Sequence, residues 1–294
     1  MDTRDEPRSA QPRQSLRGTA LQDLPHLREG AVSGSGEHRL CVLVLAGARA
    51  GGDPLCQAEG VASKAVIEIG GQPMLARVLG ALAGSRAAGL APGVIGLEDA
   101  ALAEAAGGHP CTARRAGGQG PAASLLAALE NGADLPALVT TCDHALLTPA
   151  MIDSFLEGAY ASGADLCVGF ASRATIEAAY PRTRRTYLRF RGADLSGCNL
   201  FYLAGPRALD VLRFWRAAEQ DRKRPWRILW RFGPLTALRI LLFRPTPEVT
   251  FALLSRRVGA DVRPVILPYA EAAIDVDTPG DLELVRGIVA ERAA

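Results

Sequence analysis

The sequence predicts an α/β fold with a doubly wound, mostly parallel sheet and a smaller, partly antiparallel section. Through the first 170 residues, short apolar runs alternate with segments of helical periodicity, which is typical of successive βαβ units. The first run is continuously apolar and does not alternate with polar residues, as expected for a strand that helices cover on both faces. Further along, two strand-like segments predict the antiparallel section.

The elements of the first half follow in order. Val42–Leu45 is the continuous apolar run and predicts a buried parallel strand. Met74–Ala83 has apolar residues at helical spacing, and a glycine- and proline-containing turn precedes it. A glycine cluster precedes the helix expected at Ala122–Glu130. The other expected elements are extended segments at Ala65–Ile69, Gly93–Leu97 and Ala137–Thr141 and a helix at Leu102–Ala106.

The second half continues with a helix at Met151–Ala161 and a strand at Asp165–Phe170. Pro206–Glu219 predicts a helix with proline at its first position, where the missing N–H costs nothing. A final helix is expected at Pro279–Ala290, opened by Thr278 and Pro279. The remaining expectations are a strand pair formed by Tyr187–Arg191 and Asn199–Leu203, and a late strand at Val262–Leu267.

The composition is that of an ordinary globular protein. The 294 residues are 48% hydrophobic and 22% charged, and the net charge of +2 gives no reason to expect nucleic acid as a partner. The six cysteines are widely spaced without a CxxC pair, which argues against zinc and favours free thiols in an intracellular protein. No apolar run is long enough to span a bilayer, and the N-terminus lacks a signal peptide's apolar core. These observations predict a cytoplasmic protein.

Two regions differ from the rest of the chain. Residues 1–37 are polar and lack periodicity, so we expect a disordered tail before a folded domain at residues 38–294. Residues 205–258 are expected to be a helical insertion rich in basic and aromatic side chains.

The centre of this insertion, residues 221–244, interleaves arginines with tryptophans. One interpretation is a binding site, including Arg222 and Lys223, for a phosphorylated acceptor that is lipidic or membrane-proximal. Such an acceptor would place the protein peripherally at the inner membrane surface. Another is a pair of helices on the sheet edge whose arginines reach water. A third is the interface of a homodimer.

The first strand leads into a glycine-rich loop, CVLVLAGARAGGDPL, of a kind that often holds phosphate. Gly47 and Gly52 have the spacing of a P-loop, but Asp and Pro follow where that motif requires Lys and Ser or Thr. A dinucleotide fingerprint fails as well, because a long loop is expected up to Lys64, one of only two lysines among 33 basic residues. The interpretation that remains is a loop whose backbone N–H groups face an anion, with Arg49 and Lys64 neutralising the charge of a polyphosphate. The alternative is a glycine-rich turn without a ligand.

Three aspartates are candidate metal ligands. Asp143 follows an apolar strand, where open α/β sheets place their ligands, and Thr148 is the better cap for the next helix. A carboxylate there can bind Mg²⁺, which takes one or two carboxylates plus phosphate oxygens. Asp275 and Asp277 are expected to point the same way along a strand, so either could be a second ligand. Asp281 fits the first turn of the final helix, where the dipole favours it.

These features resemble the nucleotidyltransferases with a glycosyltransferase-A-like fold, and in particular the MobA-like NTP transferases. The matching segments, in order, are LAGARAGG with Lys64, GGQPML, GGQGPAASLLAAL, TTCDHALLTP, GCNLFYL and DVDTPGDL. They extend over roughly residues 40–288, so the resemblance covers the whole domain. It implies a Rossmann-like nucleotidyltransferase domain at residues 38–294.

The resemblance implies a role for each matching residue. Arg49, Lys64 and Asp143 would be catalytic, with Lys64 contacting the phosphates and the developing charge. Asp143 would also bind Mg²⁺ or Mn²⁺, and Asp277 or Asp275 would complete the metal site. The residues expected to bind the nucleotide are Leu45, Ala46, Gly47, Gly51, Gly52, Gly118, Gly120 and Ser124.

The reaction implied is transfer of NMP from an NTP, with CTP or GTP favoured, to a phosphorylated small-molecule or lipid-linked acceptor, with release of pyrophosphate. Asn199 resembles the asparagine that contacts the acceptor. Two departures favour an acceptor other than the molybdenum cofactor: the insertion between Gly52 and Lys64, and His144 after the metal aspartate.

The alternatives are a sugar transferase of the same fold and a non-catalytic nucleotide-binding protein. A sugar transferase carries a DxD motif mid-chain, whereas here only Asp143 stands there and DVD is near the C-terminus.

Overall fold

The computed structural model describes residues 39–47, 52–118, 120–130, 134–220, 233, 238 and 242–293. The chain divides after Glu37, and all of these residues belong to the second unit, His38–Ala294. Several predictions concern residues outside this description. They are the tail over 1–37, the roles of Arg49, Gly51, Arg222 and Lys223, and most of the segment 221–244.

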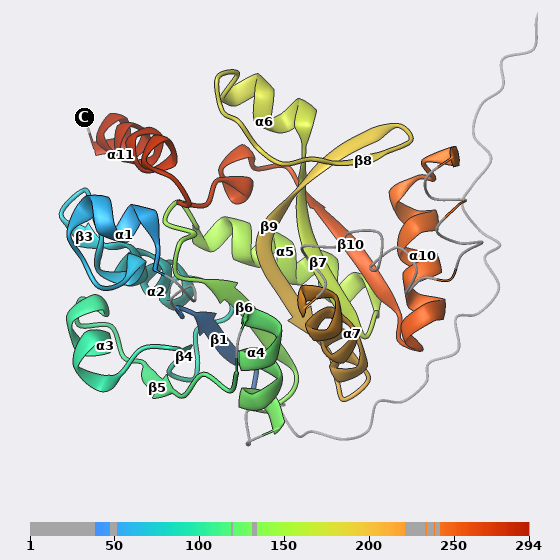
Figure 1. Cartoon of the computed structure of the whole chain (residues 1–294), viewed down its shortest axis with the longest axis horizontal. Helices are drawn as coiled ribbons and strands as arrows, with labels where there is room; N and C mark the ends of the chain where they lie inside the picture. The colour runs from blue at the N-terminus through green and yellow to red at the C-terminus, as the bar shows by residue number, and fades with distance from the viewer. Residues whose placement is uncertain are drawn as a thin grey trace, which may run out of the picture. The chain divides into compact units, whose positions relative to one another are not determined.

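The second unit is built on one eight-stranded sheet (Figure 1). Its strands are β1 (Cys41–Leu45), β4 (Gly93–Ile95), β5 (Thr112–Arg114), β6 (Ala137–Thr141), β7 (Leu166–Ser172), β8 (Leu188–Phe190), β9 (Ala193–Leu203) and β10 (Val262–Leu267). The order is β10-β7-β9-β6-β1-β4-β5, with β8 paired to β9. β9 pairs antiparallel with β6, β7 and β8, and the other strand pairs of this sheet in the described residues are parallel. The predicted α/β fold with a mostly parallel sheet and a partly antiparallel section is therefore confirmed.

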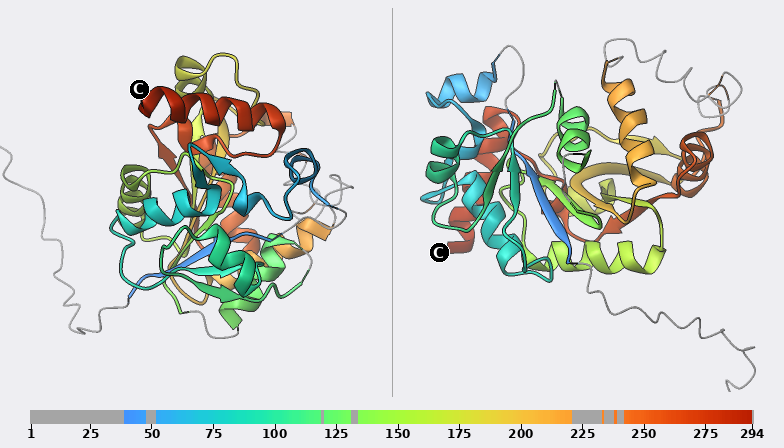
Figure 2. Two further views of the ribbon diagram at one scale, coloured as in Figure 1. Left: turned by 90° about the vertical axis from the view of Figure 1, so that its left-hand side faces the viewer. Right: turned by 90° about the horizontal axis from the view of Figure 1, so that it is seen from below.

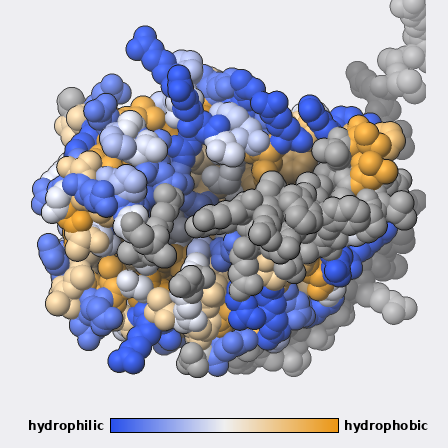
Figure 3. Space-filling model, in the orientation of Figure 1, coloured by the Kyte–Doolittle hydropathy of each residue, from blue (hydrophilic) through white to orange (hydrophobic). Residues whose placement is uncertain are grey.

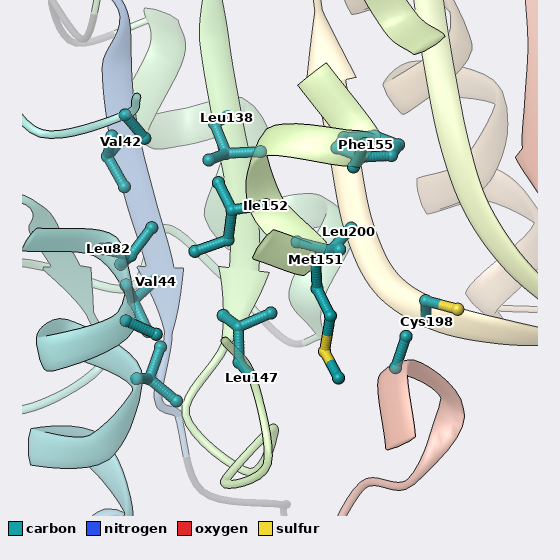
Figure 4. Packing of buried hydrophobic residues seen from close by; sticks show 14 of the residues in the cluster. Val42, Val44, Leu82, Leu138, Leu147, Met151, Ile152, Phe155, Cys198 and Leu200 are labelled. Carbon is teal, nitrogen blue, oxygen red and sulfur yellow. The ribbon is translucent and has the colours of Figure 1, made fainter. Parts of the chain in front are cut away.

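Helices cover both faces of this sheet (Figures 1 and 2). Val42 and Val44 of β1 belong to the core on one face, and Leu43 and Leu45 belong to the core on the other. Two buried faces explain why the first strand is apolar throughout. Figure 4 shows the first core, where Phe155 packs near β9. The helices are α2 (Met74–Ala83), α3 (Asp99–Ala105) and α5 (Pro149–Ser162) in the first core, and α4 (Pro121–Glu130), α7 (Ala208–Gln220) and α10 (Pro247–Val258) in the second.

A third, smaller core joins the segments that follow β1 and β6 to the C-terminal helix α11 (Pro279–Ala293). Helix α1 (Pro54–Glu59), the 3₁₀ helix η1 (Lys64–Val66) and the hairpin of β2 (Glu68–Ile69) and β3 (Gln72–Pro73) also lie there, beside α11 in Figures 1 and 2. The buried side chains of this core include Leu55, Ile67, Leu146 and Val276. Each of these four lies within three residues of a charged residue of the candidate site.

Three expectations about secondary structure are wrong. Ala65–Ile69 is not one extended segment, because it starts inside η1 and only its last two residues are a strand. Tyr187–Arg191 does not pair with Asn199–Leu203. Instead β8 pairs with the start of β9 across a tight turn at Gly192, whose φ of +82° suits glycine. Pro206 lies in the turn before α7, not at its first position.

The structure describes the two ends of the segment 205–258, which form the helices α7 and α10. Leu212 and Phe251 anchor them in the second core, so this part of the segment belongs to the folded domain. Sequence patterns missed α1 and a further helix, α6 (Arg173–Ala179), whereas α10 lies inside the segment expected to be helical. All six cysteines are free thiols, as expected. In the described ranges, no helix is long and apolar enough to cross a membrane.

Candidate functional site

The candidate site lies at the edge where the parallel strands end. Leu45, Ile95 and Thr141 are the last residues of β1, β4 and β6, which run in one direction. The loops that follow these strands therefore leave the sheet on the same side, where open α/β sheets bind their ligands. The predicted phosphate loop and Asp143 are on two of these loops.

The start of the predicted phosphate loop, at Ala46 and Gly47, lies close to the loop after β4. The N–H of Ala46 donates to the carbonyl of Ile95 at 2.9 Å. A Cβ on Gly96 would lie 2.6 Å from the Cα of Gly47, so this approach of two backbones requires glycine. Gly52 has φ +87°, which also favours glycine.

The segment between Gly52 and Lys64 is not the long loop expected from the sequence. It contains α1, which Asp53 caps by accepting the N–H of Leu55 on Oδ1 at 2.9 Å. Pro54 stands at the first helical position, and the helix ends at Gly60 in the left-handed conformation. This Asp-Pro…Gly pattern is a helix signal that sequence reasoning missed.

Lys64 is surrounded by carboxylates. Its Nζ donates to Oδ1 of Asp277 at 2.5 Å and to the carbonyl of Val276 at 2.9 Å. Oδ2 of Asp53 lies 3.5 Å away and Oδ2 of Asp143 lies 3.7 Å away. Burial alone would lower the pKa of Lys64, but the bond to Asp277 and the charges of the other carboxylates outweigh it, and the pKa is raised. The structure therefore brings together three residues predicted from the sequence and one, Asp53, that was not.

Asp143 is fixed by its neighbours at the end of β6. The hydroxyl of Thr141 donates to Oδ1 at 2.5 Å, and the N–H of Val276 donates to the main-chain carbonyl of Asp143 at 3.0 Å. Burial raises the pKa of this carboxyl, and the bond from Thr141 and the charge of Lys64 act against the increase. The bond from Val276 places the C-terminal DVD motif beside the loop after β6. Thr148 caps α5, as predicted.

Asp275 and Asp277 do not lie on a strand, so the expectation that they point the same way is wrong. The segment from Ile274 to Thr278 is irregular. Asp277 bonds Lys64, whereas Asp275 forms an ion pair with Arg185 and accepts the amide N–H of Asn199 at 3.2 Å. The two carboxylates thus belong to different groups, and Asp277 is the one that shares a cation with Asp143.

Arg185 is a partly buried charged residue that sequence reasoning missed. Its guanidinium pairs with Asp275 and, at 2.9 Å, with Oδ1 of Asp281. Its side chain is only 10% exposed. Asp281 in turn accepts the N–H and hydroxyl of Thr278 at 2.9 and 2.7 Å, which fixes the start of α11. The arginine therefore connects the loop before β8 to the segment that carries Asp277.

Asn199 lies in a bulge of β9. Val168 pairs with Phe201 but Phe170 pairs with Gly197, so β9 has two extra residues at this point. Asn199 takes φ +50°, a conformation that asparagine tolerates better than most residues. Bulges next to active sites commonly re-aim a side chain. Here the bulge is associated with the bond from Asn199 to Asp275.

The second glycine loop precedes α4. Gly118 and Gly120 both have positive φ, +152° and +102°. The N–H of Ser124 donates to the carbonyl of Gly120 at 3.1 Å, and Ser124 is buried. A nearby cavity of about 360 Å³ lies at the ends of β4 and β5. Its lining residues are Gly96, Leu97, Glu98, Arg114, Arg115 and Ala116.

The residues present fit a divalent cation that is completed by phosphate oxygens. In the part of the chain that is described, no three His, Cys, Asp or Glu side chains are grouped as a complete metal site. Asp143 and Asp277 nevertheless share one bound cation, the ammonium of Lys64. Mg²⁺ is usually bound through one or two carboxylates when a nucleotide supplies the other ligands, so this pair would suffice.

His144, one of the departures noted in the sequence, is buried in the core at 1% exposure. Within the described residues, neither of its ring nitrogens has a hydrogen-bond partner. Burial lowers the pKa of His144 to about 4, while the backbone of Glu271 opposes the decrease and the charge of Arg185 adds to it. The ring is therefore neutral at physiological pH.

We expect His144 to make the fold sensitive to acid. Its pKa is about 6.5 in an unfolded chain and about 4 in the folded one. Between these values only the unfolded chain binds the proton, so the free energy of unfolding falls as the pH falls. From pH 7.5 to pH 5 the loss from this group is about 2 kcal/mol. Urea unfolding at both pH values should show that His144→Leu loses about 2 kcal/mol less than the unmodified protein. An equal loss in both would contradict this origin.

The chain is similar to several known proteins. The model of the MobA-like NTP transferase domain matches residues 42–227. A hypothetical transferase from Thermus thermophilus has 31% sequence identity and a TM-score of 0.70, covering 83% of this chain and 99% of that chain. The structure of CMP:2-keto-3-deoxy-manno-octonic acid synthetase complexed with CTP has 16% identity and a TM-score of 0.52, covering 86% and 99%. Molybdopterin-guanine dinucleotide biosynthesis protein A from Archaeoglobus fulgidus has 13% identity and a TM-score of 0.48, covering 86% and 100%. No curated protein matches the chain in sequence.

Proposed function

The chain belongs to the family of MobA-like NTP transferase domains, and we propose that it transfers NMP from an NTP to a phosphorylated acceptor with release of pyrophosphate. One observation carries this proposal: Lys64, Asp143 and Asp277 converge at the edge where the parallel strands end. The group combines a cation for phosphate with two carboxylates for a divalent cation, and a glycine loop adjoins it.

The proposed reaction is a single displacement. An oxygen of the acceptor phosphate attacks the α-phosphorus, and the bond from that phosphorus to the oxygen bridging to the β-phosphate breaks. The electron pair of this bond leaves with pyrophosphate, so no covalent intermediate with the protein is needed. The chain aligns the reactants, and Lys64, with Arg49 as a further proposed catalytic residue, offsets negative charge on the transferring group. Asp143 and Asp277 would hold Mg²⁺ or Mn²⁺, which supplies charge neutralisation when bound.

The nucleoside side of the site is proposed to lie over the ends of β1, β4 and β5. Leu45, Ala46 and Gly47 would contact the base and ribose, with Gly51 and Gly52 around the triphosphate. Gly118, Gly120 and Ser124 would contact the base beside the cavity at the ends of β4 and β5. A neighbour of the same fold is complexed with CTP, and we propose CTP or GTP for this chain.

The acceptor is proposed to bind on the side of Asn199. The segment 181–191, which contains β8, has five arginines and no acidic residue. Hydrophilic side chains gather along the upper edge of the face shown in Figure 3. Such a surface favours a phosphorylated acceptor. We propose that Arg222 and Lys223 extend it. A lipid-linked acceptor would bring residues 221–244 to the inner membrane surface, and flotation with liposomes would test this. A homodimer through the same segment is the competing proposal, and sedimentation would detect it.

The test is a pyrophosphate-release screen with the four NTPs and Mg²⁺ against sugar, polyol and lipid phosphates. We expect release with one NTP and one acceptor class, and no release without acceptor. Nucleotide binding without release for any acceptor would support a non-catalytic protein. Transfer of sugar from a sugar nucleotide, without pyrophosphate, would support the alternative enzyme class and overturn the proposal.

A further inference from the structure

The ammonium of Lys64 occupies a position between carboxylates, where a metal ion could also be bound. Asp53, Asp143 and Asp277 lie 3.5, 3.7 and 2.5 Å from its Nζ. Three carboxylates and one ammonium give a net charge of −2, which one divalent cation would balance. The thiols of Cys56 and Cys142 lie close by, but burial raises the pKa of each, so they add no charge.

The three carboxylates hold Lys64 in different ways. Asp53 is the most buried, with 6% of its side chain exposed, and its Oδ1 is committed to capping α1. Only its Oδ2 faces the lysine, and Leu55 in the third core fixes the helix behind it. Asp277 is the most open, with 37% of its side chain exposed. A ligand that enters from solvent can therefore reach Asp277 and Asp143 more readily than Asp53.

We propose that Lys64 holds the place of the divalent cation in the nucleotide-free protein. When a metal–triphosphate enters, the cation takes Asp143 and Asp277, and Lys64 turns to the phosphates while Asp53 remains its counter-ion. This inference rests on the proposed function for the arriving ligand, but the exclusion of metal from the nucleotide-free site can be tested alone. Asp53 is a positioning residue in this scheme, because it acts through Lys64.

Holding Lys64 in the place of the divalent cation has a chemical advantage. A strongly charged pair of carboxylates would otherwise bind cations without substrate or repel the incoming triphosphate. An internal ammonium offsets this charge until the triphosphate supplies a better partner for the lysine. Metal and nucleotide then bind as one unit, so their binding is positively coupled.

The first experiment measures Mn²⁺ binding by electron paramagnetic resonance in the absence of nucleotide. The unmodified protein should bind Mn²⁺ weakly, and Lys64→Met should bind it at least tenfold more tightly, because the competing ammonium is gone. Asp53→Asn is the matched control: asparagine still caps α1, and Lys64 stays in place, so Mn²⁺ binding should not tighten. Equal Mn²⁺ affinity in the unmodified protein and Lys64→Met would overturn the proposal.

The second experiment adds a nucleotide. With the α,β-methylene analogues of CTP and GTP, Mn²⁺ affinity should rise in the unmodified protein and should rise less in Lys64→Met, where the site is already open. The same rise in both proteins would contradict the exchange. If neither analogue binds to either protein, the proposed function fails, and the first experiment still decides the exclusion of metal.

A failure of Lys64→Met to fold would not remove the test. Lys64→Gln provides a second neutral variant, and thermal unfolding in EDTA and in Mn²⁺ provides a second measurement. Loss of the ammonium leaves three carboxylates together, so the melting temperature should fall in EDTA and should rise more with Mn²⁺ than that of the unmodified protein. An equal rise in both would count against the proposal.

Discussion

Replacing Asp143 by alanine should lower the rate of pyrophosphate release about 10²–10³-fold, which corresponds to about 3–4 kcal/mol of lost transition-state stabilisation. The reason lies in the position of the carboxylate. It follows β6, is fixed by the hydroxyl of Thr141, and shares Lys64 with Asp277. No other described carboxylate at the end of β6 can replace it, because Cys142 and His144 flank it. Single-turnover measurements with saturating NTP would isolate the chemical step.

The control for this variant is Glu104→Ala, which removes an exposed acid from α3. Its rate should match that of the unmodified protein. Thermal unfolding must first show that Asp143→Ala is folded. This is expected, because the substitution leaves the rest of the fold around β6 unchanged. A folded Asp143→Ala protein that releases pyrophosphate at the unmodified rate would contradict both the metal role and the proposed reaction.

The fold and the principal charged residues could be predicted because their signals are local. A buried strand covered on both faces is continuously apolar, and β1 and β6 each lead directly into the loop that bears site residues. The prediction of Lys64 rested on its rarity and its place after the glycine loop. Those patterns establish which residues are exceptional, but not which of them meet in space.

The remaining features depend on contacts between distant segments. Asp275 and Asp277 are two residues apart and look equivalent in sequence, yet each has a different partner, Arg185 for one and Lys64 for the other. Arg185 is one arginine among five in its segment, and only the packing of α11 distinguishes it. The bulge at Asn199 arises from pairing with β7, which no pattern within β9 indicates.

The third core explains how these distant segments meet. Leu55, Ile67, Leu146 and Val276 are all buried in it, and each is close in sequence to a charged residue of the site. Packing of apolar side chains is non-directional, so it brings the segments together but does not by itself orient the carboxylates. Orientation comes from the polar contacts around them, among which are the ion pairs of Lys64 and of Arg185.

Replacing Arg185 by alanine should destabilise the fold by about 3 kcal/mol, because it leaves two largely buried carboxylates, Asp275 and Asp281, without their shared cation. Urea unfolding at neutral pH would measure this loss. Arg184→Ala is the matched control, since its side chain is exposed and forms no ion pair with the described residues. Its effect should stay within about 0.5 kcal/mol.

Arg185→Lys separates charge from geometry at the same position. A lysine keeps the positive charge but cannot bond both carboxylates as a planar fork does, so its stability should fall between those of Arg185→Ala and the unmodified protein. Because Asp281 also fixes Thr278 at the start of α11, loss of the arginine should displace the segment that carries Asp277. Pyrophosphate release should then fall in the same order as stability. Arg185→Ala could also prove no less stable than Arg184→Ala. In that case the ion pairs of Arg185 with Asp275 and Asp281 add no stability, and the position of Asp277 depends on the apolar core alone.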